Sequence, residues 1–167
     1  DDAADSSGSS AVNADLTRAS QLGGDAQDDV FLNIEDVFGS GEDDTIAGDD
    51  NDNFLRGVDG DDRLTGAGGN DLIDGGEGRD NRSGNEGDDT GEGGAGNDNL
   101  FGNEGDDTLS GGTGNDVLAG GRGADALNGG SGFDTASYGD ASAAVTVDLN
   151  DPNAGTGDAA GDSFAEI

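Results

Sequence analysis

The sequence contains no cysteine, histidine, lysine, methionine or tryptophan, and it has one proline and one tyrosine. Because cysteine and histidine are the usual ligands of zinc and copper, their absence argues against chemistry based on those metals. The same absences leave no recognisable nucleophile or acid–base arrangement, so we expect no enzyme activity. The sequence shows no apolar stretch of membrane length and no signal-segment pattern, and the lack of cysteine suits a secreted protein without disulfides.

Positive charge and apolar side chains are both scarce. Six arginines stand against 39 acidic residues, which gives a formal net charge of −33, and hydrophobic residues make up 29% of the chain. So strong a negative charge argues against binding to nucleic acid and against insertion into, or binding to, anionic membranes. A composition of this kind, with 35 glycines, is typical of a disordered polypeptide. Disorder is therefore the alternative to any ordered reading of the sequence.

An ordered pattern does exist, and it is a nine-residue repeat. Eleven copies follow one another without insertion or deletion from Gly39 to Ser137. Clear copies are GGAGNDNLF at residues 93–101 and GGTGNDVLA at residues 111–119. Their common template is G-G-x-G-x-D-x-U-x, in which U is an apolar residue.

Four positions of the repeat carry its physical content. The first is glycine in all eleven copies, and the fourth is glycine in nine, the exceptions being Glu42 and Asn51. The sixth is aspartate in ten copies, with Asn53 as the exception. The eighth position holds Ile46, Leu55, Leu64, Ile73, Arg82, Gly91, Leu100, Leu109, Leu118, Leu127 and Ala136.

Each nonapeptide is predicted to form a turn followed by a short strand. Glycine at a fixed spacing supplies backbone angles that a Cβ would forbid. The triplet around the eighth position is long enough for a strand whose middle side chain points to one face. One unit cannot bury its single apolar residue alone, whereas stacked units bury a continuous file of them. The repetition therefore predicts an all-β solenoid.

This pattern resembles the RTX family, the repeats-in-toxin or hemolysin-type calcium-binding repeats. The resemblance is close over residues 39–137 and loose in the flanks. It implies a right-handed parallel β-roll in which two nonapeptides make one turn, the strands form two small parallel sheets, and six-residue turns bind calcium. It also implies export in unfolded form through a one-step bacterial channel (type I secretion), followed by folding outside the cell.

The residue types agree with Ca²⁺ as the bound ion. Calcium takes about 6–8 oxygen ligands, which carboxylates and the carbonyls of glycine-rich turns can supply. If units two apart stack, sixth-position side chains 18 residues apart share a site. One edge would pair successive members of the series Asp44, Asp62, Asp80, Asp98, Asp116 and Asp134, and the other those of the series Asn53, Asp71, Asp89, Asp107 and Asp125. These series give about nine candidate sites, and the site with Asn53 should be weaker because it has one charge fewer.

Backbone carbonyls of the turns complete the predicted ligand set. They are assigned to turn residues such as Gly60, Gly69, Gly78, Gly87, Gly94, Gly96, Gly105, Gly112, Gly114, Gly123 and Gly132. About nine calcium ions would offset about 18 of the 33 net negative charges, so we expect metal binding and folding to be one event. Without calcium the chain should stay open, and with calcium the roll should close.

Arg82 and Gly91 occupy consecutive eighth positions, where the preceding copies have isoleucine or leucine. In a roll with two repeats per turn they would face each other, with Arg82 lying between Leu64 and Leu100. A buried guanidinium without a partner is costly. We therefore interpret the pair structurally: the arginine stem fills the room that the glycine leaves, while its head reaches solvent. The alternative is a bend or contact point with a function of its own.

The flanks of the roll repeat with a second, longer period. Residues 1–34 and 134–167 align without gaps at an offset of 133 residues. The alignment predicts a tandem array whose unit is a 34-residue spacer followed by eleven nonapeptides, with this chain as a window cut from it. We divide the chain into a spacer or cap at residues 1–38, the calcium-binding roll at residues 39–137 and the start of the next spacer at residues 138–167.

The spacers carry strand signals of their own. Residues 145–149 alternate between apolar and polar side chains, residues 11–16 repeat this pattern, and residues 30–34 form a second candidate strand. The open ends of a roll leave strand edges unpaired. The spacers are therefore predicted to cover or continue those ends.

Taken together, these features predict a calcium-binding structural module that folds outside the cell or at the bacterial cell surface. Cytosolic calcium is too low to load many modest sites. The long tandem period favours a segment of a long repetitive protein, such as an adhesin, a surface-layer or matrix protein, or a filament subunit. Calcium ions, copies of itself and neighbouring tandem units are the expected partners, and surface polysaccharide is a further candidate. The alternatives are an accessory module of a secreted enzyme or cytolysin, and a carbohydrate-binding solenoid.

Overall fold

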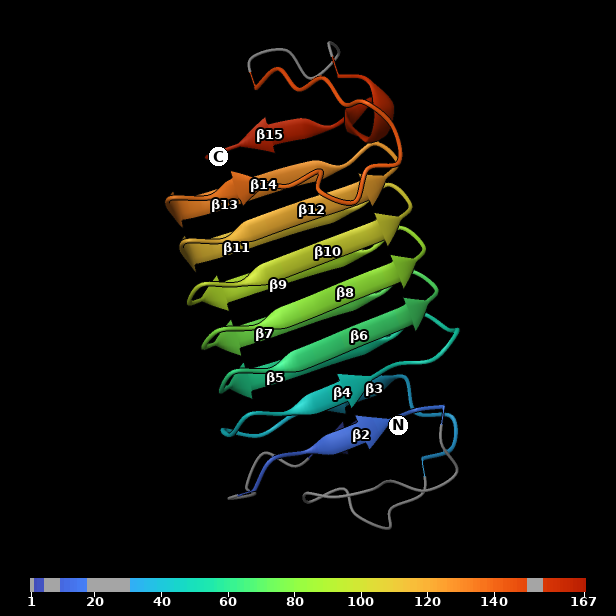
Figure 1. The fold of residues 1–167 in the computed structure, drawn as a ribbon. Coiled ribbons are helices and arrows are strands. Elements are labelled where there is room, and N and C mark those ends of the chain that lie inside the picture. The colour runs from blue at the N-terminus through green and yellow to red at the C-terminus, as the bar shows by residue number, and fades with distance from the viewer. Residues whose placement is uncertain (1, 5–9, 18–30, 150–154) are drawn as a thin grey trace.

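The described part of the chain folds into a stack of short β-strands with almost no helix (Figure 1). The computed structural model describes residues 2–4, 10–17, 31–149 and 155–167. The strands are β1 (Asp2–Ala4), β2 (Asn13–Asp15), β3 (Asp36–Phe38), β4 (Thr45–Ala47), β5 (Phe54–Asp59), β6 (Arg63–Gly68), β7 (Leu72–Glu77), β8 (Asn81–Glu86), β9 (Thr90–Ala95), β10 (Asn99–Glu104), β11 (Thr108–Gly114), β12 (Val117–Arg122), β13 (Ala126–Gly132), β14 (Thr135–Ala136) and β15 (Ser163–Ala165). A 3-10 helix, η2, spans Gly157–Ala159. The predicted all-β class is confirmed.

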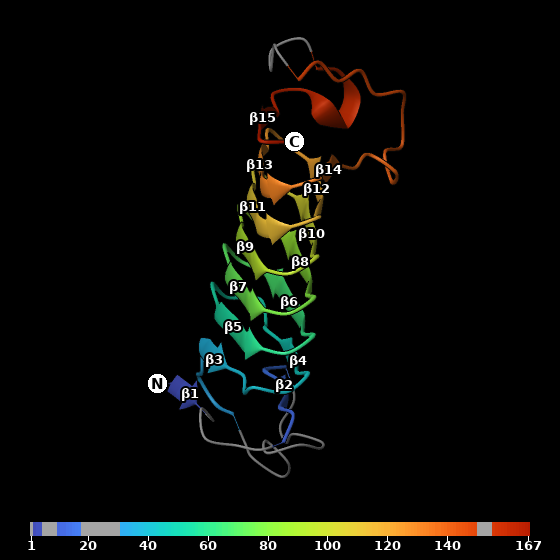
Figure 2. The ribbon, with the colours of Figure 1, turned by 90° about the vertical axis from the view of Figure 1, so that its left-hand side faces the viewer.

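Successive strands alternate between two parallel sheets that face each other across a narrow core (Figure 2). The odd-numbered strands β1 to β15 form the eight-stranded sheet, and the even-numbered strands β2 to β14 form the seven-stranded one. Within the roll, paired residues lie 18 positions apart, as Leu55 pairs with Ile73 and Leu64 with Arg82. Two nonapeptides therefore make one turn of a parallel β-solenoid, which confirms the predicted stacking.

The strands extend beyond the predicted triplets. Pairing continues past the first glycine of the next repeat, as Val58 pairs with Gly76 and Asp59 with Glu77. A positive φ at the second position, such as 110° at Gly76, lets the chain change direction there while its pairing with the next turn continues. Val58 adopts φ 101° at the same position, which is unfavourable for a β-branched residue. The repeat thus contains a longer strand and a shorter turn than its sequence suggested.

The core consists of eighth-position side chains and three residues of the N-terminal spacer, and it forms two separate clusters. One cluster contains Val12, Ala14, Val37, Ile46, Leu55, Leu64 and Ile73. The other contains Leu100, Leu109, Leu118 and Leu127. The turn that carries Arg82 and Gly91 lies between the clusters, since Arg82 pairs with both Leu64 and Leu100. The predicted location of these two residues is therefore confirmed.

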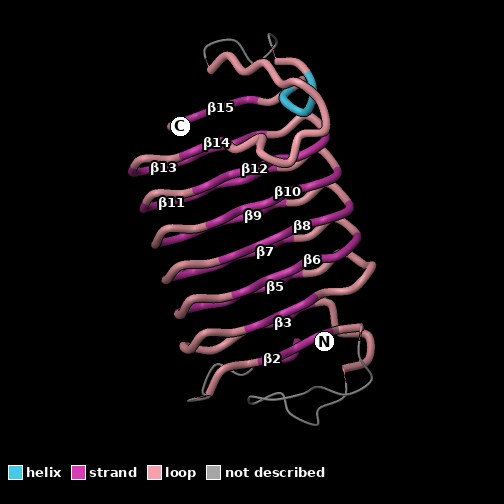
Figure 3. The backbone as a smooth tube through the Cα atoms, viewed as in Figure 1, coloured by secondary structure: helices cyan, strands magenta, loops and turns pink. Residues whose placement is uncertain are grey.

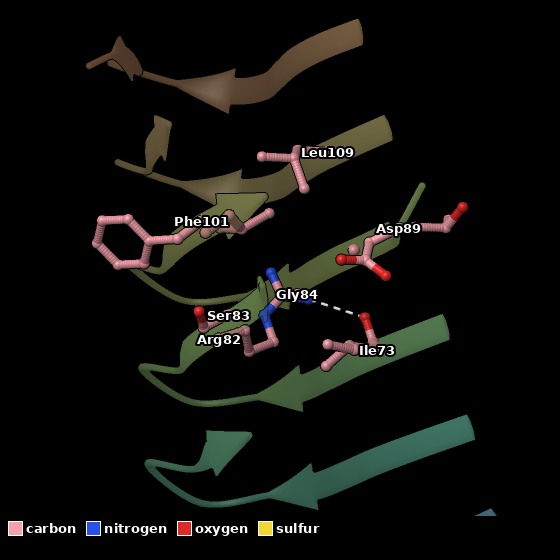
Figure 4. Close-up of a pocket in the computed structure, with 10 residues that line it drawn as sticks. Ile73, Arg82, Ser83, Gly84, Asp89, Phe101 and Leu109 are labelled. Carbon is pink, nitrogen blue, oxygen red and sulfur yellow. Dashed lines mark hydrogen bonds between the residues drawn. The ribbon is translucent and has the colours of Figure 1, made fainter. Parts of the chain in front are cut away.

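Arg82 does not reach solvent, and that part of the prediction is wrong. Its side chain is buried, with 2% exposure, and its Nη1 donates a hydrogen bond to the carbonyl oxygen of Ile73 at 3.1 Å (Figure 4). Nε and Nη2 have no hydrogen-bond partner among the described residues. Burial lowers the pKa of Arg82 to about 10, although Asp98 and Asp80 oppose the shift. With no side chain at Gly91, the whole guanidinium fits inside the roll beside a cavity of about 10 Å³.

We expect the double substitution Arg82→Leu with Gly91→Leu to stabilise the calcium-loaded roll by about 1–4 kcal/mol. It would replace a poorly partnered buried charge with apolar side chains that join the two core clusters. A Cβ on Gly91 would meet only the flexible Cδ2 of Leu109, at 3.2 Å, and an earlier turn already buries two leucines at these positions, Leu55 and Leu64. Denaturant unfolding at saturating calcium measures the change.

The exposed Arg63 provides the control for charge removal. Arg63→Leu also removes one positive charge but leaves the core unchanged, so its stability should stay close to that of the parent. A double variant no more stable than the parent would show that the buried arginine costs the fold nothing.

The described parts of both spacers extend the sheets. At the N-terminal end, β1 pairs with β3, and β2 pairs with β4 so that Ala14 lies opposite Ile46. At the C-terminal end, β15 pairs with β13. No helix in the described ranges is long and apolar enough to cross a membrane.

Two of the predicted spacer strands do not form as expected. Residues 145–149 contribute only an isolated antiparallel bridge between Thr146 and Thr156, although residues 13–15 of the matching N-terminal segment form β2. β2 pairs with β4, whereas residues 145–149 pair with no strand among the described residues. Residues 31–34 form no strand, and Val30 lies outside the described residues.

Candidate metal centre

The turns line up along each edge of the roll (Figure 3). Hydrogen bonds between successive turns join the sixth-position side chains into a ladder along each edge. The Oδ1 atom of Asp62 accepts a hydrogen bond from the backbone N–H of Asp44, at 2.8 Å. Equivalent bonds of 2.8–3.0 Å join Asn53 to Asp71, Asp62 to Asp80, Asp71 to Asp89, Asp80 to Asp98, Asp89 to Asp107, Asp98 to Asp116, Asp107 to Asp125 and Asp116 to Asp134. The structure therefore brings together the side chains that the sequence paired at 18 residues.

The second oxygen of most of these carboxylates is buried without a partner. Eight Oδ2 atoms make no hydrogen bond among the described residues: those of Asp62, Asp71, Asp80, Asp89, Asp98, Asp107, Asp116 and Asp125. A buried acceptor left in this state costs about 1–3 kcal/mol, and more when it is charged. So regular a series of unsatisfied oxygens indicates positions that a cation would occupy.

The first glycine of each repeat makes room for these oxygens. A Cβ on Gly75 would stand within van der Waals contact of Asp80 Oδ2 and 2.7 Å from the carbonyl oxygen of Gly93 in the next turn. A Cβ on Gly57 would meet Asp62 and the Gly75 carbonyl in the same way. A carboxylate oxygen and a backbone carbonyl therefore converge where a side chain is missing. This cradle explains why the first position is always glycine.

Nine of the eleven predicted carbonyl ligands face the gaps between turns, and the other two, those of Gly123 and Gly132, stay predictions. The carbonyl oxygen of Gly60 points at the position of a Cβ on Gly78, and that of Gly78 points at Gly96. The same arrangement recurs for the carbonyls of Gly69, Gly87, Gly94, Gly96, Gly105, Gly112 and Gly114. Within the described residues, no three acidic side chains converge on one point. A cation held here would therefore take many of its ligands from the backbone, which suits calcium.

Burial dominates the electrostatics of the ladder. It raises the pKa of Asp62 and Asp125 from 3.8 to about 7. It raises the pKa of Asp71, Asp98 and Asp107 to about 6, and that of Asp80, Asp89 and Asp116 in the same direction. The N–H bond from the preceding turn lowers each pKa, while neighbouring carboxylates raise it further in most of the series. Carboxylates in this environment favour either a proton or a metal ion.

The sixth-position residues at the ends of the two edges differ from those between them. Asp44 has protein donors at both oxygens, because Val12 N–H binds Oδ1 and Ser40 N–H binds Oδ2. Asn53 places its Oδ1 in the cradle of Gly48 and accepts the N–H of Asp49 at 2.8 Å. Asp134 is half-buried and accepts the N–H of Asp116. The buried carboxylate oxygens without a hydrogen-bond partner thus lie between these ends.

The structure also reveals a ladder of another kind, formed by the fifth-position residues, that the sequence analysis missed. Asp43 Oδ1 accepts the N–H of Asp61 at 2.9 Å, and Asp88 Oδ1 accepts that of Asp106 at 2.9 Å. Asp52, Asp61, Asn70, Asn97, Asp106 and Asn115 accept in the same way. These bonds run in the opposite direction to those of the sixth position. The available signal was the presence of Asp or Asn at eight of the eleven fifth positions.

Comparison with known proteins agrees with this geometry. The model of the RTX calcium-binding nonapeptide repeat matches the chain in four copies, at residues 33–58, 48–81, 83–118 and 101–136. No curated protein matches the chain. The matched residues cover more than half of the chain and contain the sixth-position and fifth-position ladders of the roll. The chain belongs to the RTX calcium-binding nonapeptide repeat family.

Proposed function

We propose that this chain is a calcium-rigidified structural segment of a long, repetitive extracellular bacterial protein. An adhesin, a surface-layer or matrix protein, and a filament subunit all fit this role. The observation that carries the proposal is the series of eight buried Oδ2 atoms without partners along the two edges. Calcium would satisfy these oxygens and stiffen the roll at each turn.

The residues that would hold calcium are the sixth-position carboxylates and the turn carbonyls that face the same gaps. The bound ion would supply positive charge to a chain whose formal net charge is −33. The cradles at the first glycines would admit it, and the N–H bonds to Oδ1 would orient each carboxylate. Because the ladder joins every turn to the next, loading one gap should favour order in its neighbours. Folding and binding would then be coupled.

A mechanical role is also supported by the way the acidic residues are used. The buried aspartates of the described roll all lie in the ladder at fixed intervals, which is the arrangement of a scaffold. Without histidine, cysteine or lysine, the chain has few groups suited to general acid–base or nucleophilic chemistry. We therefore propose that it is not an enzyme. Extracellular calcium would load the roll after export.

The test compares far-ultraviolet circular dichroism and light scattering with and without millimolar calcium at neutral pH. We expect a β-sheet spectrum only with calcium, since the unpartnered buried carboxylates oppose folding without it. Folding of a species that stays monomeric would support a role as a stiff spacer, and folding with polymerisation would support a filament or layer subunit. A β-sheet spectrum that persists unchanged in chelator would refute the proposal.

A further inference from the structure

The ladder continues past the last nonapeptide into the C-terminal spacer. Asp162 Oδ1 accepts the backbone N–H of Asp125 at 3.0 Å, as the other rungs do, but the two residues are 37 positions apart instead of 18. Asp162 is fully buried, with 0% exposure. The spacer therefore delivers an aspartate to the sixth position of an additional turn on this edge.

The backbone around Asp162 follows the same register. Ser163 pairs with Ala126 and Phe164 with Leu127, and Ser163 N–H donates to the carbonyl of Asp125 at 2.7 Å. The carbonyl oxygen of Glu166 reaches the cradle of Gly129. In the roll, that place belongs to the first glycine of the next turn. Residues 162–166 thus reproduce the sixth to ninth positions and the following first position without the nonapeptide sequence.

Asp125, to which Asp162 is joined, has an unpartnered oxygen of its own. Its side chain is 1% exposed, and its Oδ2 has no hydrogen-bond partner among the described residues. That oxygen lies in the cradle of Gly120, where a Cβ would collide with it. The Asp125 carboxylate is thus buried with one unpartnered oxygen, like the carboxylates between two nonapeptide turns. A cation between Asp125 and the spacer would therefore be stabilised in the same way as one within the roll.

Tyr138 closes the ladder beyond Asp162. Its hydroxyl donates a hydrogen bond to Asp162 Oδ2, the oxygen that has no partner in most other rungs. A protein donor thus replaces the cation at the last carboxylate oxygen, much as Ser40 and Val12 do for Asp44 at the other end.

We propose that Asp125 and Asp162 hold a further divalent, oxygen-preferring cation, which fastens the C-terminal spacer to the roll, and that the Tyr138 hydroxyl ends the ladder. The inference rests on the proposed calcium-dependent function and extends it to residues outside the nonapeptides. Figure 2 shows the spacer and η2 above the last strands of the roll. Binding of the cation between Asp125 and Asp162 would determine whether the spacer stays packed on the end of the roll.

The experiment uses terbium as the probe ion, because Tb³⁺ occupies oxygen-ligand calcium sites and luminesces when a nearby tyrosine transfers energy to it. The chain has one tyrosine and no tryptophan, so only an ion close to Tyr138 is sensitised. We expect sensitised emission from the parent protein. Asp162→Asn should reduce it to the background set by Tyr138→Phe and should bind one calcium ion fewer, with its β-sheet spectrum retained. Asp80→Asn, the matched control, removes a distant carboxylate and should keep the emission.

Each outcome decides the inference. A parent protein that folds with terbium but shows no sensitised emission, or an Asp162→Asn variant that keeps the full emission, would overturn it. An Asp162→Asn variant that no longer folds with calcium would also overturn it, because Asp162 would then serve the whole roll and not one terminal gap. A parent protein that shows no ion-induced β-sheet spectrum would instead reject the proposed function itself.

Discussion

Gly75→Ala should remove at least one bound calcium ion and destabilise the loaded roll by roughly 3–5 kcal/mol. The added methyl group would overlap Asp80 Oδ2 and stand 2.7 Å from the carbonyl oxygen of Gly93. Gly75 does not have a positive φ, so alanine is acceptable to the backbone itself. The cost comes from filling the cradle. Asp80, which is fully buried, would have to turn away and give up its bond from the N–H of Asp62.

Gly41→Ala is the matched control for this effect. A Cβ on Gly41 would have no atom within 4 Å, and this glycine also lacks a positive φ. Its stability and calcium stoichiometry should therefore equal those of the parent. Denaturant unfolding at saturating calcium and equilibrium dialysis measure the two quantities. Equal stability and stoichiometry in the two variants would show that the first glycine is not needed to bring the oxygens together.

The strict nine-residue phase explains why the main features of the fold could be predicted. In a solenoid the register is fixed by the period, so a constant spacing of aspartates and leucines determines which side chains share an edge and which share the core. Leu55 opposite Ile73, and Asp62 beside Asp80, follow directly from that spacing. The eighth-position file also placed Arg82 correctly within the core. These relations require no knowledge of side-chain conformation.

What could not be predicted depends on details that the period does not contain. The fifth-position ladder tolerates Arg79, Ala124 and Phe133, because each still supplies the backbone N–H that the ladder needs, and this variety hides the pattern. Asp162 was missed because its spacing of 37 residues breaks the phase while the strand pairing restores the register.

The orientation of Arg82 was wrong for a different reason. The prediction that its head reaches solvent assumes that water is the best hydrogen-bond partner for the guanidinium. In the folded chain the guanidinium instead bonds to the Ile73 carbonyl and lies beside Gly91, inside the roll. The outcome depends on the local shape of the core, which one sequence position cannot reveal.

In the absence of calcium, acidification should fold the chain. In chelator we expect an open chain at about pH 7.5 and a β-sheet spectrum at about pH 5, with the transition between these values. Burial raises the pKa of Asp62 and Asp125 to about 7 and that of Asp71, Asp98 and Asp107 to about 6. Protonation would thus replace calcium in part, because it neutralises the buried carboxylates of the ladder.

The direction of the effect follows from proton linkage. The folded-state pKa of each of these five aspartates lies above 3.8, the value of an unperturbed aspartate, so the folded state binds more protons than the unfolded state. The stabilisation from this extra protonation is fully present below about pH 3.8 and is lost as the pH rises through 6 to 7. The same protons compete with calcium. The apparent calcium affinity should therefore fall as the pH is lowered from neutral.

General repulsion among the 33 excess negative charges could also keep the chain open, and salt separates the two causes. At 1 M salt the screening length is about 3 Å, which suppresses repulsion between exposed charges without protonating a buried carboxylate. If buried charge is the cause, salt at pH 7.5 should leave the calcium-free chain unfolded, whereas Asp62→Asn with Asp125→Asn should move the acid transition to higher pH. Light scattering must accompany the titration, because the isoelectric point is about 4.1.

Asn53 already shows that the fold accepts a neutral side chain at a sixth position, since its Oδ1 lies in the cradle of Gly48 and accepts the N–H of Asp49. The asparagine variants therefore remove charge while keeping an acceptor oxygen at each position. Folding of the calcium-free parent in salt alone at pH 7.5 would assign the barrier to surface repulsion. Folding by acid and by the asparagine variants, but not by salt, would assign it to the buried carboxylates and so to the same oxygens that make calcium necessary.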